Sequence, residues 1–187
     1  MSAATIRLAA AADFAAITAI TNHYIRTTTV HFATQPVTAQ ELHDDWQAQR
    51  EVHPWLVTEV AGAVLGYAKA GVFRSRAAYR WTTETGVYLD ADHCGQGLGE
   101  PLYRRLLEVL RAQGFHSVIG GIALPNPTSV RLHERLGFVA VGAIRRAGRK
   151  FDRWVDVGFW QLALQDAHHE PAPLLPPAVA MRALGEP

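Results

Sequence analysis

Cysteine is almost missing from this sequence, and its scarcity excludes several kinds of site. Cys94 is the single cysteine among 187 residues, so the chain forms no internal disulfide and no zinc site made of several thiolates. A lone thiol fits a reducing compartment, and we expect a cytoplasmic location. The nine histidines show no ligand spacing such as HExxH, so we expect no metal.

An excess of one charge and long apolar runs are lacking as well. The 18 Lys and Arg residues against 17 Asp and Glu residues leave a net charge of +1, too little for a basic field that binds nucleic acid. No apolar run approaches the roughly 20 residues of a membrane span. Hydrophobic residues make up 49% of the chain and charged residues 19%, which is typical of a folded globular domain. We therefore expect neither a nucleic-acid nor a membrane partner.

Hydrophobic periodicity predicts alternating strands and helices. Strands are expected at 6–8, 55–60, 64–72, 82–89, 117–124, 138–141 and 155–164. Helices are expected after an N-cap at Asp13, after a capping box at Thr38–Glu41, from Leu98 to Gly114 and from Thr128 to Leu136. This order predicts an α/β (α+β) fold, a mixed sheet with helices on both faces.

The last part of the chain differs in composition from the rest. Five of the ten prolines lie from Gln165 onward. We therefore divide the chain into a domain over residues 1–164 and a proline-rich tail over 165–187. Such a tail is expected to be extended and loosely attached.

A glycine-rich turn stands between an expected strand and an expected helix. Gly95, Gly97 and Gly99 follow the strand that ends at Leu89. Glycines let the backbone approach a ligand, and free amides at a helix N-terminus favour an anion, so such a turn can hold a pyrophosphate. A turn with a purely structural role is about as common. A Rossmann turn is disfavoured, because the turn does not open the domain and no acidic residue ends a strand about 20 residues later.

The segment Gly95-Gln96-Gly97-Leu98-Gly99 after Val87-Tyr88-Leu89 resembles the acetyl-CoA loop of the GNAT acetyltransferase superfamily. Further segments are similar, in order, to the phosphinothricin acetyltransferase family: Asn22–Ile25, Thr29–Phe32, Tyr79–Thr82, Leu124–Pro127, Ser129–Glu134 and Asp156–Gln161. The resemblance implies a GNAT fold, with a mostly antiparallel sheet of about six or seven strands, flanked by about four helices and splayed at its centre. It also implies a homodimer, with which an exposed aromatic segment at Phe159-Trp160 is compatible.

The resemblance further implies acetyl-CoA as co-substrate. The positions that match cofactor-binding residues are Val87, Tyr88, Leu89, Cys94, Gly95, Gln96, Gly97, Leu98, Gly99, Glu100, Tyr103 and Asn126. Asn126 is equally suited to a helix N-cap, and periodicity alone favours core packing for Tyr103. The loop departs from the family pattern at Cys94 and at Glu100-Pro101. We expect Glu100 to point to solvent, where its charge is screened, and Pro101 to be tolerated in a first helical turn.

Acetyl transfer from a thioester to an amine requires a base for the amine, stabilisation of the oxyanion and a proton for the departing thiolate. From the sequence alone, Glu84 on its strand is more often a solvated residue, and His133 a helix-surface or capping residue. By resemblance, Glu84 matches the family's catalytic glutamate, and we expect it to be the general base. His133 matches a family histidine and is expected to be the acid or base partner of Glu84.

The family resemblance also implies which residues bind the acceptor substrate. The matching substrate-binding positions are Phe32, Arg74, Arg76 and Tyr79. Guanidinium groups suit carboxylate and phosphinate oxygens, so the implied reaction is acetylation of the α-amine of phosphinothricin, methionine sulfoximine or methionine sulfone. A role in herbicide resistance and a role in the detoxification of amino-acid analogues are equally compatible with this reaction. Two alternatives stay open: a GNAT acting on another small amine, and a catalytically silent acyl-CoA-binding sensor.

Overall fold

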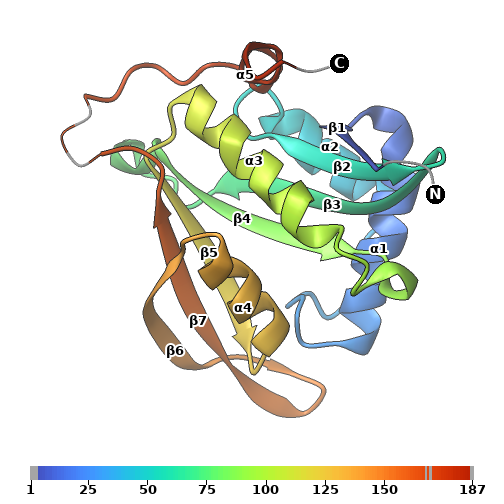
Figure 1. Cartoon of the computed structure of the whole chain (residues 1–187). Coiled ribbons are helices and arrows are strands. Elements are labelled where there is room, and N and C mark those ends of the chain that lie inside the picture. The colour runs from blue at the N-terminus through green and yellow to red at the C-terminus, as the bar shows by residue number, and fades with distance from the viewer. Residues whose placement is uncertain (1–3, 167, 169, 186–187) are drawn as a thin grey trace.

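The computed structural model describes residues 4–166, 168 and 170–185, which form one open sheet with helices on both faces (Figure 1). Its seven strands are arranged in the order β1-β2-β3-β4-β5-β7-β6, and only β4 and β5 run parallel. The strands are β1 (Thr5–Leu8), β2 (Trp55–Val60), β3 (Ala63–Val72), β4 (Thr82–Leu89), β5 (Ser117–Leu124), β6 (Val139–Lys150) and β7 (Arg153–Ala163). The expected mixed, mostly antiparallel sheet is confirmed.

Among the described residues, four helices lie close to the positions that the sequence predicts, and a fifth, in the tail, was not predicted. They are α1 (Phe14–Thr27), α2 (Ala39–Gln49), α3 (Gly99–Gln113), α4 (Pro127–Arg135) and α5 (Pro177–Ala183). The capping box of α2 is present, since Thr38 Oγ1 accepts from the Glu41 N–H and the Glu41 carboxylate accepts from the Thr38 N–H. Gly114 closes α3 with φ +98°, a left-handed conformation that favours glycine. Within the described ranges, no helix has both the length and the apolar character needed to cross a membrane.

Alternation along the strands divides the core into two layers. Leu56 and Ala68 pack against α3, whereas Val57 and Tyr67 pack against α1 and α2. Successive side chains of a strand point to opposite faces, so each central strand contributes to both layers. Figure 1 shows α3 on one side of the sheet and α1 and α2 on the other.

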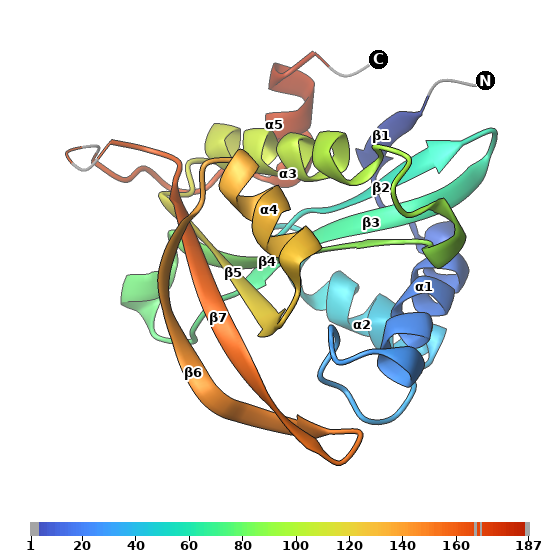
Figure 2. The same cartoon turned by 60° about the horizontal axis from the view of Figure 1, so that its bottom comes forward.

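The centre of the sheet is open. The parallel pairing of β4 with β5 runs from Thr82–Ser117 to Thr85–Gly120. Both strands continue beyond this point, β4 paired with β3 and β5 paired with β7, and Figure 2 shows them moving apart. The carboxyl-terminal halves of β4 and β5 therefore each present one edge to a gap, as expected from the resemblance.

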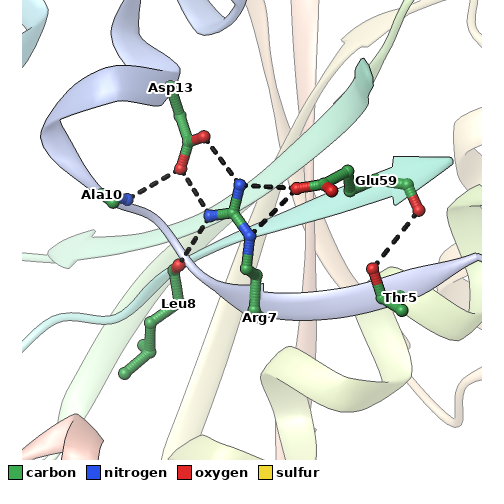
Figure 3. A network of polar contacts seen from close by, with 6 residues as sticks. All are labelled: Thr5, Arg7, Leu8, Ala10, Asp13 and Glu59. Carbon is green, nitrogen blue, oxygen red and sulfur yellow. Dashed lines mark hydrogen bonds and ion pairs between the residues drawn. The ribbon is translucent and has the colours of Figure 1, made fainter. Parts of the chain in front are cut away.

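A partly buried ionic network connects the first strand to the rest of the sheet and to the start of α1 (Figure 3). Arg7 donates two hydrogen bonds to Asp13, of 2.7 and 2.8 Å, and two to Glu59 Oε2, of 2.7 and 3.1 Å. Asp13 also accepts from the Ala10 N–H at 2.8 Å. Burial opposes ionisation of Asp13, but these hydrogen bonds outweigh it and lower its pKa. The expected N-cap role is wrong in one respect: α1 begins after Asp13, but the carboxylate makes no cap bond to that helix, because Arg7 and Ala10 engage it.

The tail is not loosely attached, contrary to expectation. Helix α5 packs on α3, and the side chains of Ala180 and Met181 are fully buried in the main core cluster. Gln113 Nε2 donates to the Leu175 carbonyl at 2.7 Å, and Trp81 Nε1 donates to the Ala172 carbonyl at 2.9 Å. Proline in a first helical turn favours the start of α5, and burial of its apolar face holds it in place. Residues 167, 169, 186 and 187 of the tail lie outside the described residues.

The last hairpin also differs from expectation. Strand β6 is longer than the predicted 138–141, because pairing with β7 continues through two register irregularities as far as Lys150. The aromatic segment Phe159-Trp160 is not exposed: Trp160 lies in the core cluster and Phe159 is half-buried. Alternation along β7 turns Trp160 toward the core. The exposed aromatic side chains of this hairpin are instead Phe151 and Trp154.

Replacing Met181 by alanine tests the attachment of α5. Because the Met181 side chain is fully buried, Met181→Ala should lower the free energy of unfolding by roughly 2–5 kcal/mol. The control Val179→Ala alters a partly exposed side chain of the same helix and should change it by less than about 0.5 kcal/mol. Urea denaturation followed by circular dichroism measures both. Equal, small effects of the two changes would contradict a packed α5.

Candidate active site

Glu84 lies at the centre of a hollow on the α2 side of the sheet. A pocket of about 430 Å³ is lined by residues of α2, β2, β3 and β4, including Asp45, Gln49, Lys69 and Glu84. A smaller pocket of about 260 Å³ shares Glu84, Tyr88 and Gly121 with it, and its other lining residues are Val30, His31, Phe32, Ala123, Val157 and Phe159. The carboxylate of Glu84 is thus reachable from two adjoining pockets.

Three glycines create the space around Glu84. Gly71 is the partner of Glu84 in the β3–β4 register, and Gly86 lies two residues further along β4, on the same face. Gly121 belongs to β5, and a Cβ there would lie 3.1 Å from Glu84 Oε1. Larger residues at these positions would fill the hollow. The surrounding walls withdraw water from Glu84 and raise the pKa of its carboxyl, against the opposing effect of the Lys69 charge.

The other face of the same strands carries a buried hydrogen-bonded chain. Thr85 Oγ1 lies 2.7 Å from the Tyr103 hydroxyl, which lies 3.1 Å from His133 Nε2. His133 Nδ1 lies 2.8 Å from the Ser129 carbonyl oxygen, which can only accept, so Nδ1 donates and Nε2 accepts from Tyr103. Burial lowers the pKa of His133, and the bond to Ser129 opposes this only in part. His133 is therefore neutral at neutral pH.

The structure does not bring Glu84 and His133 together. Glu84 and Thr85 are consecutive residues of β4 and point to opposite faces. The same holds on β5, where a Cβ at Gly120 would lie 2.5 Å from His133 Nε2 and a Cβ at Gly121 would approach Glu84. The two expected catalytic side chains thus lie on opposite sides of the β4–β5 layer, and their roles as base and partner stay predictions.

The glycine-rich turn leads into α3 as expected. Gly95 and Gly97 have φ near +80° and open space around their Cα atoms. The first amides of α3 precede its first intrahelical bond and are free to meet an anion. Cys94 is exposed, with its Sγ 3.6 Å from the Tyr24 hydroxyl. Pro101 is the third residue of α3, within the first turn, where its missing N–H leaves no bond unmade.

Glu100 does not simply point to solvent, contrary to expectation. Its side chain is half-buried and pairs with Arg104 at 2.8 Å and with Arg135 at 3.7 Å. Spacing of i and i+4 on α3 brings Arg104 to it, and α4 supplies Arg135. The negative charge that departs from the family pattern is therefore compensated by two cations.

The remaining predicted residues fall into separate places. Asn126 caps α4, since its Oδ1 accepts from the Ser129 N–H at 3.1 Å. Tyr103 is buried in the core cluster, with its hydroxyl in the chain described above. Phe32 lines the smaller Glu84 pocket. Arg74, Arg76 and Tyr79 line a different pocket of about 490 Å³ beside the tail, and Val72 is the residue that this pocket shares with the larger Glu84 pocket.

Sequence reasoning missed several polar residues of the Glu84 hollow. Lys69, Asp45 and Gln49 line its larger pocket, and His31 lines the smaller one. Lys69 is the single charged residue of β3, a signal that the sequence did offer. Burial lowers the pKa of His31, and the charges of Lys69 and Lys150 lower it further, to about 4.

In the described ranges, no three His, Cys, Asp or Glu residues gather so as to hold a metal ion.

Comparison with known proteins decides the family. Residues 6–158 match the model of the acetyltransferase (GNAT) domain. The chain belongs to the GNAT acetyltransferase family. Phosphinothricin N-acetyltransferase of Streptomyces viridochromogenes is 53% identical over 156 residues, covering 83% of this chain and 85% of that protein. L-methionine sulfoximine/L-methionine sulfone acetyltransferase of Salmonella typhimurium is 40% identical over 168 residues, covering 89% and 98%.

Solved structures agree with this assignment. A GNAT phosphinothricin acetyltransferase from Sinorhizobium meliloti, determined in complex with acetyl-CoA, superimposes with a TM-score of 0.86 at 33% identity and covers 92% of this chain and 94% of its own. The chain is thus a GNAT N-acetyltransferase that uses acetyl-CoA as co-substrate. The resemblance inferred from the motifs is confirmed.

The neighbouring glycines of β5 in this GNAT acetyltransferase give a matched pair of variants. Gly120→Ala must displace the buried His133 ring and should lower the free energy of unfolding by about 1–3 kcal/mol. A Cβ in Gly121→Ala would lie 3.1 Å from the end of the Glu84 side chain, which can move, and at an ordinary contact distance of 3.6 Å from the Phe159 ring. This change should lower the free energy of unfolding by less than about 1 kcal/mol. Thermal and urea denaturation distinguish them. Equal destabilisation would argue against the placement of His133 and Glu84 on opposite faces.

Proposed function

We propose that this enzyme transfers the acetyl group of acetyl-CoA to the α-amine of a small amino-acid-like acid, with Glu84 as general base. The observation that carries the proposal is the position of Glu84 on a floor of glycines, beside the opening between β4 and β5. The named activities of the two similar relatives support phosphinothricin, methionine sulfoximine and methionine sulfone as the substrate type.

The opening of the sheet and the start of α3 suit acetyl-CoA. The free edge of Val87, Tyr88 and Leu89 is proposed to pair with the pantetheine arm, and the amides of residues 94–100 to bind the pyrophosphate. Asn126 Oδ1 is occupied by its cap bond, so the amide group of its side chain is the part proposed to meet the arm. Acetyl-CoA supplies the activated acyl group, and the chain supplies position and proton acceptance.

The proposed reaction needs one proton to leave the amine. An α-amine is largely protonated at neutral pH, and a carboxylate with a raised pKa is a better proton acceptor than an ordinary one. After deprotonation the amine nitrogen attacks the thioester carbonyl carbon, the C–S bond breaks, and the products are the N-acetyl compound and the thiolate of CoA. The thiolate then takes up a proton.

His133 is proposed to act through Tyr103 rather than on the amine. Its Nε2 accepts from the Tyr103 hydroxyl, and burial keeps the imidazole neutral. In this arrangement His133 is a positioning residue for the hydroxyl, which lies on the α3 side of the strands with Thr85. The proton taken up by the thiolate is proposed to come from this side.

For the substrate side chain, Phe32 is proposed as an apolar wall of the smaller pocket. Arg74, Arg76 and Tyr79 lie beyond Val72, and we propose that they meet the oxygens at the far end of the substrate. Guanidinium groups match tetrahedral phosphinate and sulfone oxygens. The amine and the distant oxygens would then be held on two sides of Val72.

Turnover with a panel of amines tests the function. The wild-type protein should release free thiol from acetyl-CoA with phosphinothricin, methionine sulfoximine and methionine sulfone, but not with spermidine or a lysine peptide. Glu84→Gln should lower kcat by roughly 10²–10⁴-fold, the usual contribution of a general base. Because the base must be ionised and its pKa is raised, wild-type activity should fall as the pH is lowered through a value above the ordinary glutamate pKa of about 4.3.

A carboxylate in the same pocket provides the control. Asp45→Asn alters a lining residue of the larger pocket and should leave kcat within about tenfold of wild type. Loss of the low-pH decline in Glu84→Gln would complete the assignment. Wild-type turnover in Glu84→Gln would remove Glu84 from the mechanism. Binding of acetyl-CoA without turnover of any amine would favour a silent sensor.

We also propose a homodimer formed along β6. This strand is one edge of the sheet, and Val139, Val141, Ile144 and the neighbouring Trp154 expose more than half of their surface. An exposed apolar edge strand is a template for pairing with another chain. A second copy related by a twofold axis would cover this surface on both partners.

Light scattering during gel filtration tests the dimer. The wild-type protein should have about twice the monomer mass, and Ile144→Lys should shift it to the monomer, because a charge would be buried at the contact. Val72→Lys alters an equally exposed apolar residue on β3 and should leave the mass unchanged. A monomeric wild-type protein would rule the proposal out.

A cytoplasmic location is likewise proposed. The thiol of Cys94 is free and exposed, which fits a reducing compartment. Detection of the native protein in a cell-free cytosolic fraction would test this, and its recovery from an extracellular fraction would contradict it.

A further inference from the structure

Lys69 places a positive charge in the larger Glu84 pocket. It lies in β3, among apolar and small residues, directly opposite Trp55 of β2. Its Nζ lies 4.8 Å from the centroid of the Trp55 ring, a cation–π arrangement. The side chain lines the same pocket as Glu84 and Asp45, so this cation belongs to the wall of the hollow.

In the part of the chain that the structure describes, no carboxylate lies at contact distance from this cation. All ion pairs among the described residues involve other side chains, and no carboxylate oxygen of these residues lies within 4.0 Å of Lys69 Nζ. Asp45 and Glu84 favour its charged form from further away, while burial disfavours it more strongly. A partly desolvated charge is costly unless a counter-ion meets it, and the pocket leaves room for one.

The register of β3 and β4 sets Lys69 and Glu84 on one face. Lys69 is the partner of Gly86, and Glu84 is the partner of Gly71, so the two charged residues are diagonal neighbours. The other two corners of this arrangement carry no side chain. A small molecule lying over the glycines meets a cation at one end and a carboxylate at the other, which complements the carboxylate and the amine of an α-amino acid.

We propose that Lys69 binds the α-carboxylate of the acceptor and thereby directs its amine toward Glu84. Gln49 adds an acceptor at the same wall, since its Oε1 is buried without a hydrogen-bond partner among the described residues and lies 3.7 Å from the position of a Gly71 Cβ. Reorientation of that amide toward the amine would satisfy it. This inference rests on the proposed function, in which the amine faces Glu84. It makes a free carboxylate next to the amine the feature that selects substrates.

Binding to the CoA-loaded protein tests the inference without any acetyl transfer. Isothermal titration with L-methionine sulfone and with its carboxamide, which lacks the negative charge, compares wild type with Lys69→Met. The change should weaken binding of the acid by roughly 10–100-fold, as expected for loss of a charge-assisted hydrogen bond, and leave the amide within about twofold. Lys69→Arg keeps the charge and should retain most of the preference for the acid.

Arg50→Met is the matched control. Arg50 lies 4.9 Å from the Trp46 ring centroid but does not line the Glu84 pocket, so its loss removes a similar cation–π contact and should leave both affinities unchanged. Thermal denaturation of every variant checks folding. Because Lys69 lowers the pKa of Glu84, any effect of Lys69→Met through that carboxyl would alter both ligands alike and cancel in the ratio of acid to amide.

The outcomes separate the two proposals. Equal weakening of acid and amide by Lys69→Met would overturn the inference and make Lys69 a packing residue, and so would a wild-type protein that binds both ligands equally or neither. A wild-type protein that prefers the acid through Lys69 but does not acetylate it would support the inference while refuting the proposed acceptor.

Discussion

The short parallel pairing of β4 with β5 is the constraint on which the site depends. Four residue pairs hold these strands together, and beyond Thr85 and Gly120 each keeps only its outer neighbour. Unpaired backbone groups inside a protein require partners, so an opening at this position is stable only where water or a ligand can reach it. The same opening brings the end of β4, the glycine-rich turn and the N-terminus of α3 to one place (Figure 2).

Alternation of side chains turns this opening into two distinct environments. On the α2 side, glycines from three strands surround an accessible carboxylate. On the α3 side, the same strands contact a buried chain of hydroxyl groups that ends at the imidazole of His133. A single pair of adjacent glycines, Gly120 and Gly121, serves both sides, because each leaves space for a different functional side chain. The two environments are thus separated only by the backbone of the sheet itself.

Local chemistry explains what could be predicted from the sequence. The capping box of α2, the left-handed Gly114 and the bounds of β2, β4 and β5 depend on neighbours in the chain, and all were predicted. The surroundings of Glu84 depend instead on the register of three strands, so the hollow and Lys69 were not found. A glutamate between two threonines is typical of a solvated strand, and only the family resemblance singled it out.

The errors have a common origin in long-range packing. The placement of His133 and Glu84 on opposite faces was not specified by the sequence, because it follows from the alternation of side chains along the paired strands β4 and β5. The extension of β6 depends on its partner β7 rather than on its own polar sequence. Glu100 pairs with Arg104 of its own helix and with Arg135, which α4 brings close to α3. Trp160 of β7 is buried rather than exposed, because its side chain points to the face of the sheet that carries the core.

Helix α5 extends the stably folded unit beyond the family domain. The family match stops at residue 158, yet Met181 completes the core beneath α3, and backbone carbonyls of the connecting segment accept from Gln113 and Trp81. A chain that ended at the family boundary would lose the last part of β7, with Trp160, as well as α5, and the apolar surface of α3 would be exposed to water and to proteases. Shortening the chain at the family boundary would therefore remove part of the core and leave a fragment prone to aggregation.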